Sequence, residues 1–397
     1  NISGLFIKNK IKFDDLSSTI ENRNLMISAQ FLCMPFIIYL LTISKTSYKF
    51  LCFISISLFI TSLILVNSRA GFISLLLFLF ILTLLYRKSI RINKLKFILS
   101  FILSFLFIIL FVSLNTNRLE TFYDKIVQSP NLDKSPRVKL YQSTFKLIKN
   151  NFIFGVGPGN WKTEIWKYGL YKNSNTKSIA SRPHSDFLLK WAEGGILAFL
   201  CYILIFILII KKSYNLFYAI KSRERHVFSL FFSVICGFVI MSLFDFPMER
   251  VSHNIFFLII CSIVFNYDSQ NKYNNYFFPK FVYVVLFVIS SSTVCISYDK
   301  YRSEIYLNDA IKYRDLNNYD LLIESISKAY NNFHSVVDKK GTPLNWYKAI
   351  GYYNTGSFDL AIKYYHLALN KNPNHIYILN DIASAYASVN KINIESE

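Results

Sequence analysis

Charged residues are scarce in this sequence of 397 residues: they make up 17% of the chain, whereas 53% of the residues are hydrophobic. The six cysteines form no Cys-x-x-Cys pair and lie within or beside apolar runs, which argues against a disulfide framework and against a zinc site. No Asp-x-Asp pair occurs, and no Gly-Lys-Ser/Thr marks a phosphate-binding loop. We therefore expect neither a metal nor a cofactor.

The apolar residues gather in long runs, which is typical of transmembrane helices. A hydrocarbon core about 30 Å thick is crossed by about 20 apolar residues. The sequence therefore predicts an all-α fold, a polytopic bundle of about eight spans, with runs near 25–43, 49–66, 70–86, 97–114, 187–210, 227–244, 253–266 and 278–297. The run at 253–266 is short, so we expect it to be tilted or extended by its polar flanks. The sequence begins at Asn1 without a signal peptide, so we expect that further spans precede the external segment 1–23.

The net charge is +20, but the lysines and arginines gather beside the apolar runs. This placement indicates charge at a membrane surface, so we expect contacts with lipids and none with nucleic acid. The two most basic links, 87–96 and 211–225, are expected in the cytoplasm. Because each span crosses the membrane once, the outer side should then hold 67–69, 115–183, 245–252 and the chain after 298.

The C-terminal part carries the period of a tetratricopeptide repeat. Small and aromatic residues stand at the expected positions Ala349, Tyr352, Gly356, Ala361, Tyr365, Ala368 and Pro373. The register returns 34 residues later at Ala383 and Tyr386, and a weaker copy precedes it at Ala310, Tyr313 and Ala329. We therefore expect a soluble α-solenoid over 298–397, whose concave surface binds a protein partner or which merely caps the membrane domain.

Arginines on the predicted outer side are candidates for a binding site, because charge at a membrane is costly. Arg69 stands at the mouth of the third span, where its guanidinium either snorkels to lipid headgroups or clamps a lipid-linked diphosphate. Arg137 opens an amphipathic helix over 136–149, whose apolar residues recur at helical spacing. A solvated basic face explains the lysines of this helix equally well, so the spacing alone does not single out Arg137.

Arg182 and His184 lie just before the fifth span, and Glu193 follows a few turns later. The positive end of a helix dipole disfavours a protonated imidazole and attracts diphosphate, so His184 is placed to act as a base. A lone histidine at a membrane interface is, however, often without function. The segment 154–161 reads Phe-Gly-Val-Gly-Pro-Gly-Asn-Trp, which predicts a tight turn where the backbone can approach a ligand.

The order of these motifs resembles the O-antigen ligase family, which includes O-antigen polymerases and bacterial O-linked oligosaccharyltransferases. The motifs are Ser-Arg-Ala-Gly at 68–71, the external arginine helix, Gly-Val-Gly-Pro-Gly-Asn-Trp, and His-Ser-Asp-Phe-Leu at 184–188. Asn22-Arg23-Asn24, ahead of the first run, also resembles the family, and the resemblance covers roughly residues 20–265. It implies a multi-pass domain at 24–297 in the bacterial inner membrane, with a periplasmic active face that includes the loop 115–183. The repeat region at 298–397 is not part of the family pattern.

The resemblance implies a glycosyltransferase whose donor is an undecaprenyl-diphosphate-linked glycan. Arg69 and Arg137 match the family's external arginines and would stabilise the leaving diphosphate, with Arg182 and Glu193 also at the substrate. His184 would take the proton from the acceptor hydroxyl, and a single displacement would invert the anomeric centre. The acceptor is lipid A, a polysaccharide or a protein.

Several alternatives stay open at this point. A polymerase that joins repeat units and an oligosaccharyltransferase that modifies proteins would use the same chemistry as a ligase. A non-catalytic scaffold would instead recruit envelope proteins through its repeats, and it would tolerate loss of His184 or Arg69. A transporter fits less well, because the spans contain few charges that would form a path for an ion or a substrate.

Overall fold

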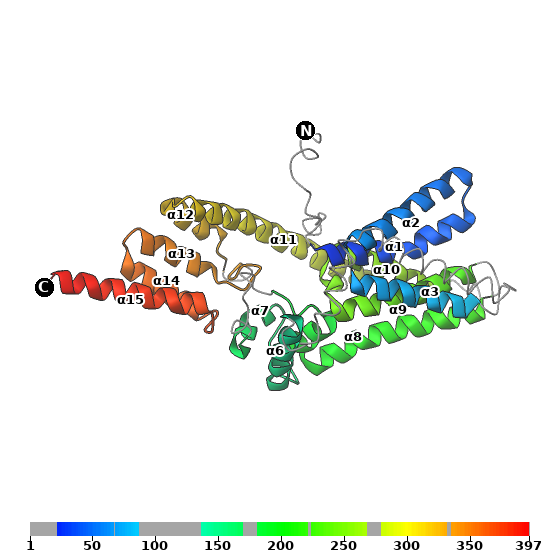
Figure 1. Cartoon of the computed structure of the whole chain (residues 1–397), viewed down its shortest axis with the longest axis horizontal. Coiled ribbons are helices and arrows are strands. Elements are labelled where there is room, and N and C mark those ends of the chain that lie inside the picture. Colours follow the sequence, from blue (N-terminus) through cyan, green and yellow to red (C-terminus); the bar gives the residue numbers. More distant parts are fainter. Residues whose placement is uncertain are drawn as a thin grey trace, which may run out of the picture. The chain divides into compact units, whose positions relative to one another are not determined.

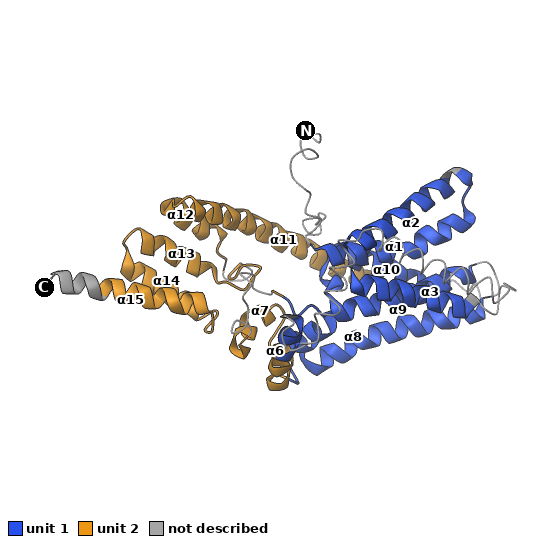
Figure 2. Cartoon of the chain, viewed as in Figure 1, with its two compact units in different colours: residues 1–142, 152–155, 182–273 blue, residues 143–151, 156–181, 274–397 orange. Residues whose placement is uncertain are grey.

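The computed structural model describes residues 22–66, 68–86, 136–169, 181–220, 224–267, 279–331 and 335–396 (Figure 1). Within these ranges the regular elements are helices, apart from two isolated β-bridges at 331–335 and 337–343. Figure 2 shows that the chain divides into two compact units. Unit 1 comprises residues 1–142, 152–155 and 182–273, and unit 2 comprises residues 143–151, 156–181 and 274–397. The predicted all-helical fold is confirmed for the described residues.

The apolar runs form the helices of a membrane bundle. Unit 1 holds α1 (Arg23–Ile43), α2 (Thr46–Val66), α3 (Arg69–Tyr86), α8 (Asp186–Ala219), α9 (Arg225–Phe244) and α10 (Val251–Asn266). Among the described residues, α1, α2, α8, α9 and the first part of α11 (Lys280–Asp315) are long and apolar enough to cross a membrane, while α3 and α10 are shorter apolar helices. Every predicted run coincides with one of these helices except 97–114, which lies outside the described residues. The chain is therefore a multi-pass membrane protein.

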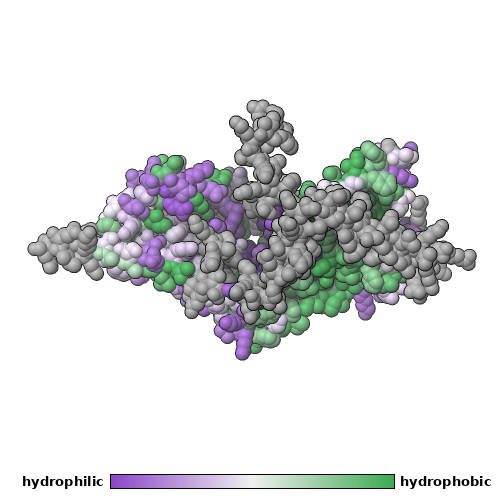
Figure 3. Space-filling view, in the orientation of Figure 1, coloured by the Kyte–Doolittle hydropathy of each residue, from purple (hydrophilic) through white to green (hydrophobic). Residues whose placement is uncertain are grey.

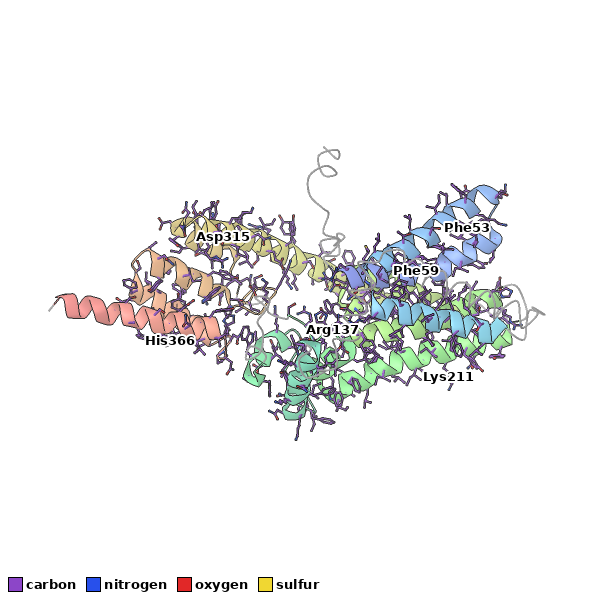
Figure 4. All side chains as sticks on the ribbon, in the orientation of Figure 1. Phe53, Phe59, Arg137, Lys211, Asp315 and His366 are labelled. Atoms are coloured by element: carbon purple, nitrogen blue, oxygen red, sulfur yellow. The ribbon has the colours of Figure 1, made fainter. Side chains whose placement is uncertain are left out.

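Aromatic packing holds the bundle together. The Phe31 ring lies 5.8 Å from Phe78 and 6.4 Å from Phe59, centroid to centroid, which joins α1 to α3 and α2. On α2 the side chain of Phe59 is buried, whereas Phe53 is 57% exposed on the outer surface (Figure 4). Hydrophobic residues cover the visible surface of these helices (Figure 3). Exposed apolar side chains on a bundle with an apolar core are suited to contact lipid acyl chains.

Several helix ends of unit 1 gather at one end of the bundle. A Cβ atom at Gly237, in the second half of α9, would lie 2.9 Å from the backbone oxygen of Ser74, near the start of α3. The buried His253, at the start of α10, contacts the Ser28 hydroxyl at 2.8 Å and the Leu25 oxygen at 2.9 Å, both near the start of α1. The starts of α1, α3 and α10 therefore lie at the same end of the bundle as the final residues of α9.

Helix α8 contains a break at Gly195, whose φ of 69° and ψ of −170° lie outside the helical region. The turn after α6 (Pro136–Asn150) docks onto this break: the Ile196 amide donates to the Phe152 oxygen at 3.0 Å. A Cβ atom at Gly195 would lie 1.9 Å from the Ile153 oxygen, and one at Gly155 would lie 2.4 Å from the Glu193 oxygen. The backbone of the predicted glycine turn therefore approaches another backbone segment closely, at a place where only glycine fits.

Unit 2 contains α7 (Trp161–Glu164), the 3-10 helix η4 (Ile165–Tyr168), α11, α12 (Tyr319–Ala329), α13 (Leu344–Asn354), α14 (Phe358–Leu369) and α15 (Ile376–Ser396). Consecutive helices from α11 to α15 pack side by side. Ala349, Ala361, Tyr365 and Ala368 share one buried core, and Ala310 and Ala329 belong to a second. Gly356 makes the turn between α13 and α14 with a φ of +79°. Ala383 and Tyr386 are exposed, because α15 buries Ile378, Ile382 and Ala385 instead. The repeat assignment itself stays a prediction.

Candidate functional site

His184 lies at the start of α8 in a strained conformation. Its φ of 53° is in the left-handed region, which a residue with a Cβ atom rarely adopts. Ser185, the next residue, caps α8 by accepting a hydrogen bond from the Leu188 amide at 3.4 Å. The His184 side chain is 32% exposed, and its Nδ1 atom lies 3.5 Å from Oδ1 of Asp245. The imidazole is therefore accessible on one side and faces a buried carboxylate on the other.

Asp245 is positioned by the end of α9 and by its contact with α8. Its amide donates to the Met241 oxygen at 2.8 Å, and its own oxygen accepts from the Asp186 amide at 3.0 Å. Asp186, which is fully buried, accepts hydrogen bonds from the Met248 amide at 3.0 Å and from the Tyr202 hydroxyl at 3.4 Å. These bonds hold the turn after α9 against the first turn of α8, so the pairing of His184 with Asp245 is built into the backbone.

Helix α6 brings Arg137 to the same place. The Tyr141 hydroxyl donates to the His184 oxygen at 3.0 Å, and Arg137 lies one turn earlier on the same face of the helix. Burial raises the pKa of Tyr141, while the charge of Arg137 lowers it and that of Asp245 raises it. Both charges therefore act on one hydroxyl. Arg137 is exposed and lies toward the opposite end of unit 1 from Lys211 (Figure 4).

Arg182 and Glu193 also lie near the start of α8. The Arg182 guanidinium forms an ion pair with Glu249 of the turn after α9, so a diphosphate at Arg182 would share it with a carboxylate. Glu193 precedes the break in α8, where its backbone oxygen faces Gly155. The structure thus brings Arg137, Arg182 and His184 together around the ends of α8 and α9, with Glu193 about two turns further along α8.

Arg69 is the first residue of α3 and is exposed. Ser68 precedes it and accepts a hydrogen bond from the Gly71 amide at 3.3 Å, which caps the helix. Because the start of α3 lies beside the end of α9, Arg69 is at the same end of the bundle as Asp245. The prediction that these motifs share one end is consistent with this packing.

Two carboxylates of this site, Asp245 and Glu249, are absent from the sequence-based candidates. They lie in the link 245–252, which is predicted to be on the same side of the membrane as His184. Acidic residues next to a span on that side were the sequence feature that could have identified them as candidates. Their partners could not be assigned from sequence, because each contact joins residues more than sixty positions apart. In the described part of the chain, no group of three or more histidine, cysteine or acidic side chains could hold a metal ion.

An imidazole paired with a buried carboxylate and accompanied by arginines can accept a proton and stabilise an anion. Residues 53–203, which include Arg69, Arg137, Arg182 and His184, match the family model described as O-antigen ligase. No curated protein and no solved structure matches the chain. The family predicted from the order of the motifs is confirmed by this match: residues 53–203 form an O-antigen ligase domain.

Proposed function

We propose that this protein transfers a glycan from an undecaprenyl-diphosphate carrier to an acceptor hydroxyl at the outer face of the bacterial inner membrane. The O-antigen ligase domain supports a glycosyltransferase of the ligase or polymerase type. The observation that carries the proposed mechanism is the contact between His184 Nδ1 and Asp245. A carboxylate at Nδ1 favours the tautomer with a proton on that atom, which leaves Nε2 as the proton acceptor.

In this mechanism His184 Nε2 takes the proton of the acceptor hydroxyl as its oxygen attacks the anomeric carbon. The bond from that carbon to the diphosphate oxygen breaks, and the diphosphate leaves with the electron pair. The anomeric centre is inverted, because one displacement takes place. Arg137 and Arg69 would offset the charge that develops on the leaving diphosphate. Tyr141, bonded to the His184 oxygen, would position the strained residue.

The test is a strain from which the gene has been deleted, supplied with variants of the full chain. We expect that His184→Ala lowers glycan transfer by about 10²- to 10⁴-fold, the usual contribution of a general base, and that the lipid-linked donor accumulates. His366→Ala is the matched control, because His366 is an exposed histidine of α14 outside this site (Figure 4). Full transfer by His184→Ala at normal protein levels would exclude the mechanism.

The same deletion strain identifies the acceptor. A ligase that acts on lipid A predicts that the lipid loses its long glycan chains. A polymerase predicts that single repeat units remain attached, and an oligosaccharyltransferase predicts that proteins lose their glycan. The scaffold alternative predicts normal function for His184→Ala.

A further inference from the structure

Unit 2 contains a contact between two segments that are far apart in the sequence. The Lys162 ammonium of α7 donates to the backbone oxygen of Asp338 at 2.6 Å. The Lys162 backbone oxygen faces Gly341, where a Cβ atom would lie 2.7 Å from it. Next along the loop, the Trp166 ring lies 4.6 Å from the His375 ring at an interplanar angle of 32°. A loop segment from the middle of the chain is thus bound to its C-terminal helices.

The turn at residues 338–342, which contacts Lys162, is held in place by its own hydrogen bonds. Asp338 Oδ1 accepts hydrogen bonds from the Lys340 and Thr342 amides at 2.8 Å each, so its own carboxylate shapes the turn that Lys162 meets. Gly341 adopts a φ of +85°, and Asn372 donates to its oxygen at 3.1 Å. The turn at 338–342 is therefore fixed by its own hydrogen bonds and by Asn372, and the backbone oxygen of Asp338 remains able to accept from Lys162.

The loop segment at residues 161–168 is also held by burial and by hydrogen bonds. Trp161 is fully buried and donates to the Thr144 hydroxyl at 3.2 Å, and Trp166 donates to the Lys162 oxygen at 3.0 Å. The His375 ring is fully buried, and neither of its nitrogens has a hydrogen-bond partner among the described residues. Burying an imidazole whose nitrogens make no hydrogen bonds costs free energy of desolvation, and contact with the neighbouring aromatic rings offsets only part of that cost.

We propose that the C-terminal helical region binds residues 161–168 of the loop as an intramolecular ligand, and that α10 crosses the membrane as a consequence. The clamp, defined by Lys162 with Asp338 and Gly341 and by Trp166 with His375, requires both segments on one side of the bilayer. This inference does not depend on which group the protein transfers.

The number of membrane crossings between the loop and the C-terminal region decides whether α10 spans the bilayer. Among the described residues, α8, α9, α10 and the apolar part of α11 lie between the loop and the chain after residue 298. Of these, α10 has only 16 residues, or about 24 Å at 1.5 Å per residue, less than a hydrocarbon core of about 30 Å. If α10 did not cross, the other three helices would bring the C-terminal region to the side opposite the loop. The clamp excludes that arrangement, so this short helix must span the bilayer, which thins locally around it.

A disulfide tests the clamp directly. A Cβ atom at Gly341 would lie 3.4 Å from the Lys162 Cβ, close to the 3.5–4.5 Å of natural disulfides. The pair Lys162→Cys and Gly341→Cys is placed in the full chain, with the native cysteines replaced by alanine and a protease site inserted in 268–278. We expect most of the cleaved chain to stay joined on a non-reducing gel after oxidation of the membranes.

The matched control is Lys162→Cys with Gly356→Cys. Gly356 has a similar φ of +79°, but a Cβ atom there meets nothing within 4 Å, so a cysteine there has the same left-handed backbone without a partner within reach. Joining of the test pair at no more than the control level overturns the clamp. If Gly341→Cys fails to accumulate, a short bis-maleimide between Lys162→Cys and the exposed Lys340→Cys replaces it, with the same two outcomes.

Labelling with a membrane-impermeant thiol reagent tests the crossing of α10. Lys167→Cys, 44% exposed in the loop segment, and Lys280→Cys, exposed at the start of α11, lie on either side of α8, α9 and α10 and are compared in intact spheroplasts and in lysed ones. We expect only one of the two sites to react before lysis, and both to react afterwards. Reaction of both sites before lysis, or protection of both, overturns the inference that α10 crosses the bilayer.

Discussion

The replacement of Gly155 by alanine tests the docking of the glycine turn on the break in α8. Gly155 has a φ of +67°, and its Cβ atom would lie 2.4 Å from the Glu193 oxygen and 2.6 Å from the Gly195 amide nitrogen. The left-handed backbone costs an alanine about 1–2 kcal/mol. The overlap with two backbone atoms adds about 1–3 kcal/mol, since neither atom can move away as a flexible side chain would.

Gly159→Ala separates these two effects. Gly159 belongs to the same motif and has a φ of +77°, but a Cβ atom there meets nothing within 4 Å. We therefore expect Gly159→Ala to cost only the backbone term of about 1–2 kcal/mol. The difference between the two variants measures the close approach itself.

Hydrogen exchange of the Ile196 amide is the direct readout, because this amide donates to the Phe152 oxygen across the docked turn. If Gly155→Ala opens that contact by about 3 kcal/mol, the exchange rate rises by about 10²-fold, since each 1.4 kcal/mol is a factor of ten. Gly159→Ala should leave this amide protected. Equal exchange at Ile196 in the two variants would refute the reasoning from steric overlap.

Three further predictions follow from the ion pairs and the buried histidine. Arg182→Ala should lower the melting temperature by leaving Glu249 without its partner, and the exchange Arg182→Glu with Glu249→Arg should restore folding but not glycan transfer if Arg182 binds the diphosphate. Asp245→Asn should lower the rate of transfer at least about tenfold with normal protein levels, because the amide no longer holds the proton on His184 Nδ1. Burial lowers the pKa of His375 from 6.5 to about 4. Above pH 6.5 the imidazole is neutral in both the folded and the unfolded state. As the pH falls from 6.5 toward 4 it is protonated first in the unfolded state, so the free energy of unfolding decreases by about 3 kcal/mol. Fluorescence-monitored unfolding should show this loss, and His375→Phe, which keeps a ring against Trp166 but cannot titrate, should abolish it.

Much of the fold follows from the sequence, because long apolar runs have few alternatives to a transmembrane helix. The run 25–43 appears as α1, and the amphipathic pattern of 136–149 appears as α6. The N-cap at Asn22, which accepts from the Asn24 amide at 2.9 Å, accounts for the polar residues ahead of the first span. Local chemistry of this kind is visible in sequence because it depends on neighbours in the chain.

The contacts that build the site are not visible in this way. His184 could be chosen from its place before a span, but its pairing with Asp245 depends on the antiparallel packing of α8 and α9. The break at Gly195 was equally hidden, since Gly194-Gly195 within an apolar run is compatible with a continuous helix. Its cause is the turn at 152–155, which reaches it from a different part of the chain.

The break in α8 also bears on the order in which the membrane domain assembles. A continuous helix satisfies its own backbone groups, whereas the broken one leaves the Ile196 amide to the Phe152 oxygen. An amide without a partner in hydrocarbon costs several kcal/mol, so the break is stable only after the turn has docked. We therefore expect α8 to keep its break only while the turn is docked. Insertion of α8 into the bilayer and docking of the turn are then separable events, so a substitution that undocks the turn should alter the start of α8 without preventing the chain from spanning the membrane.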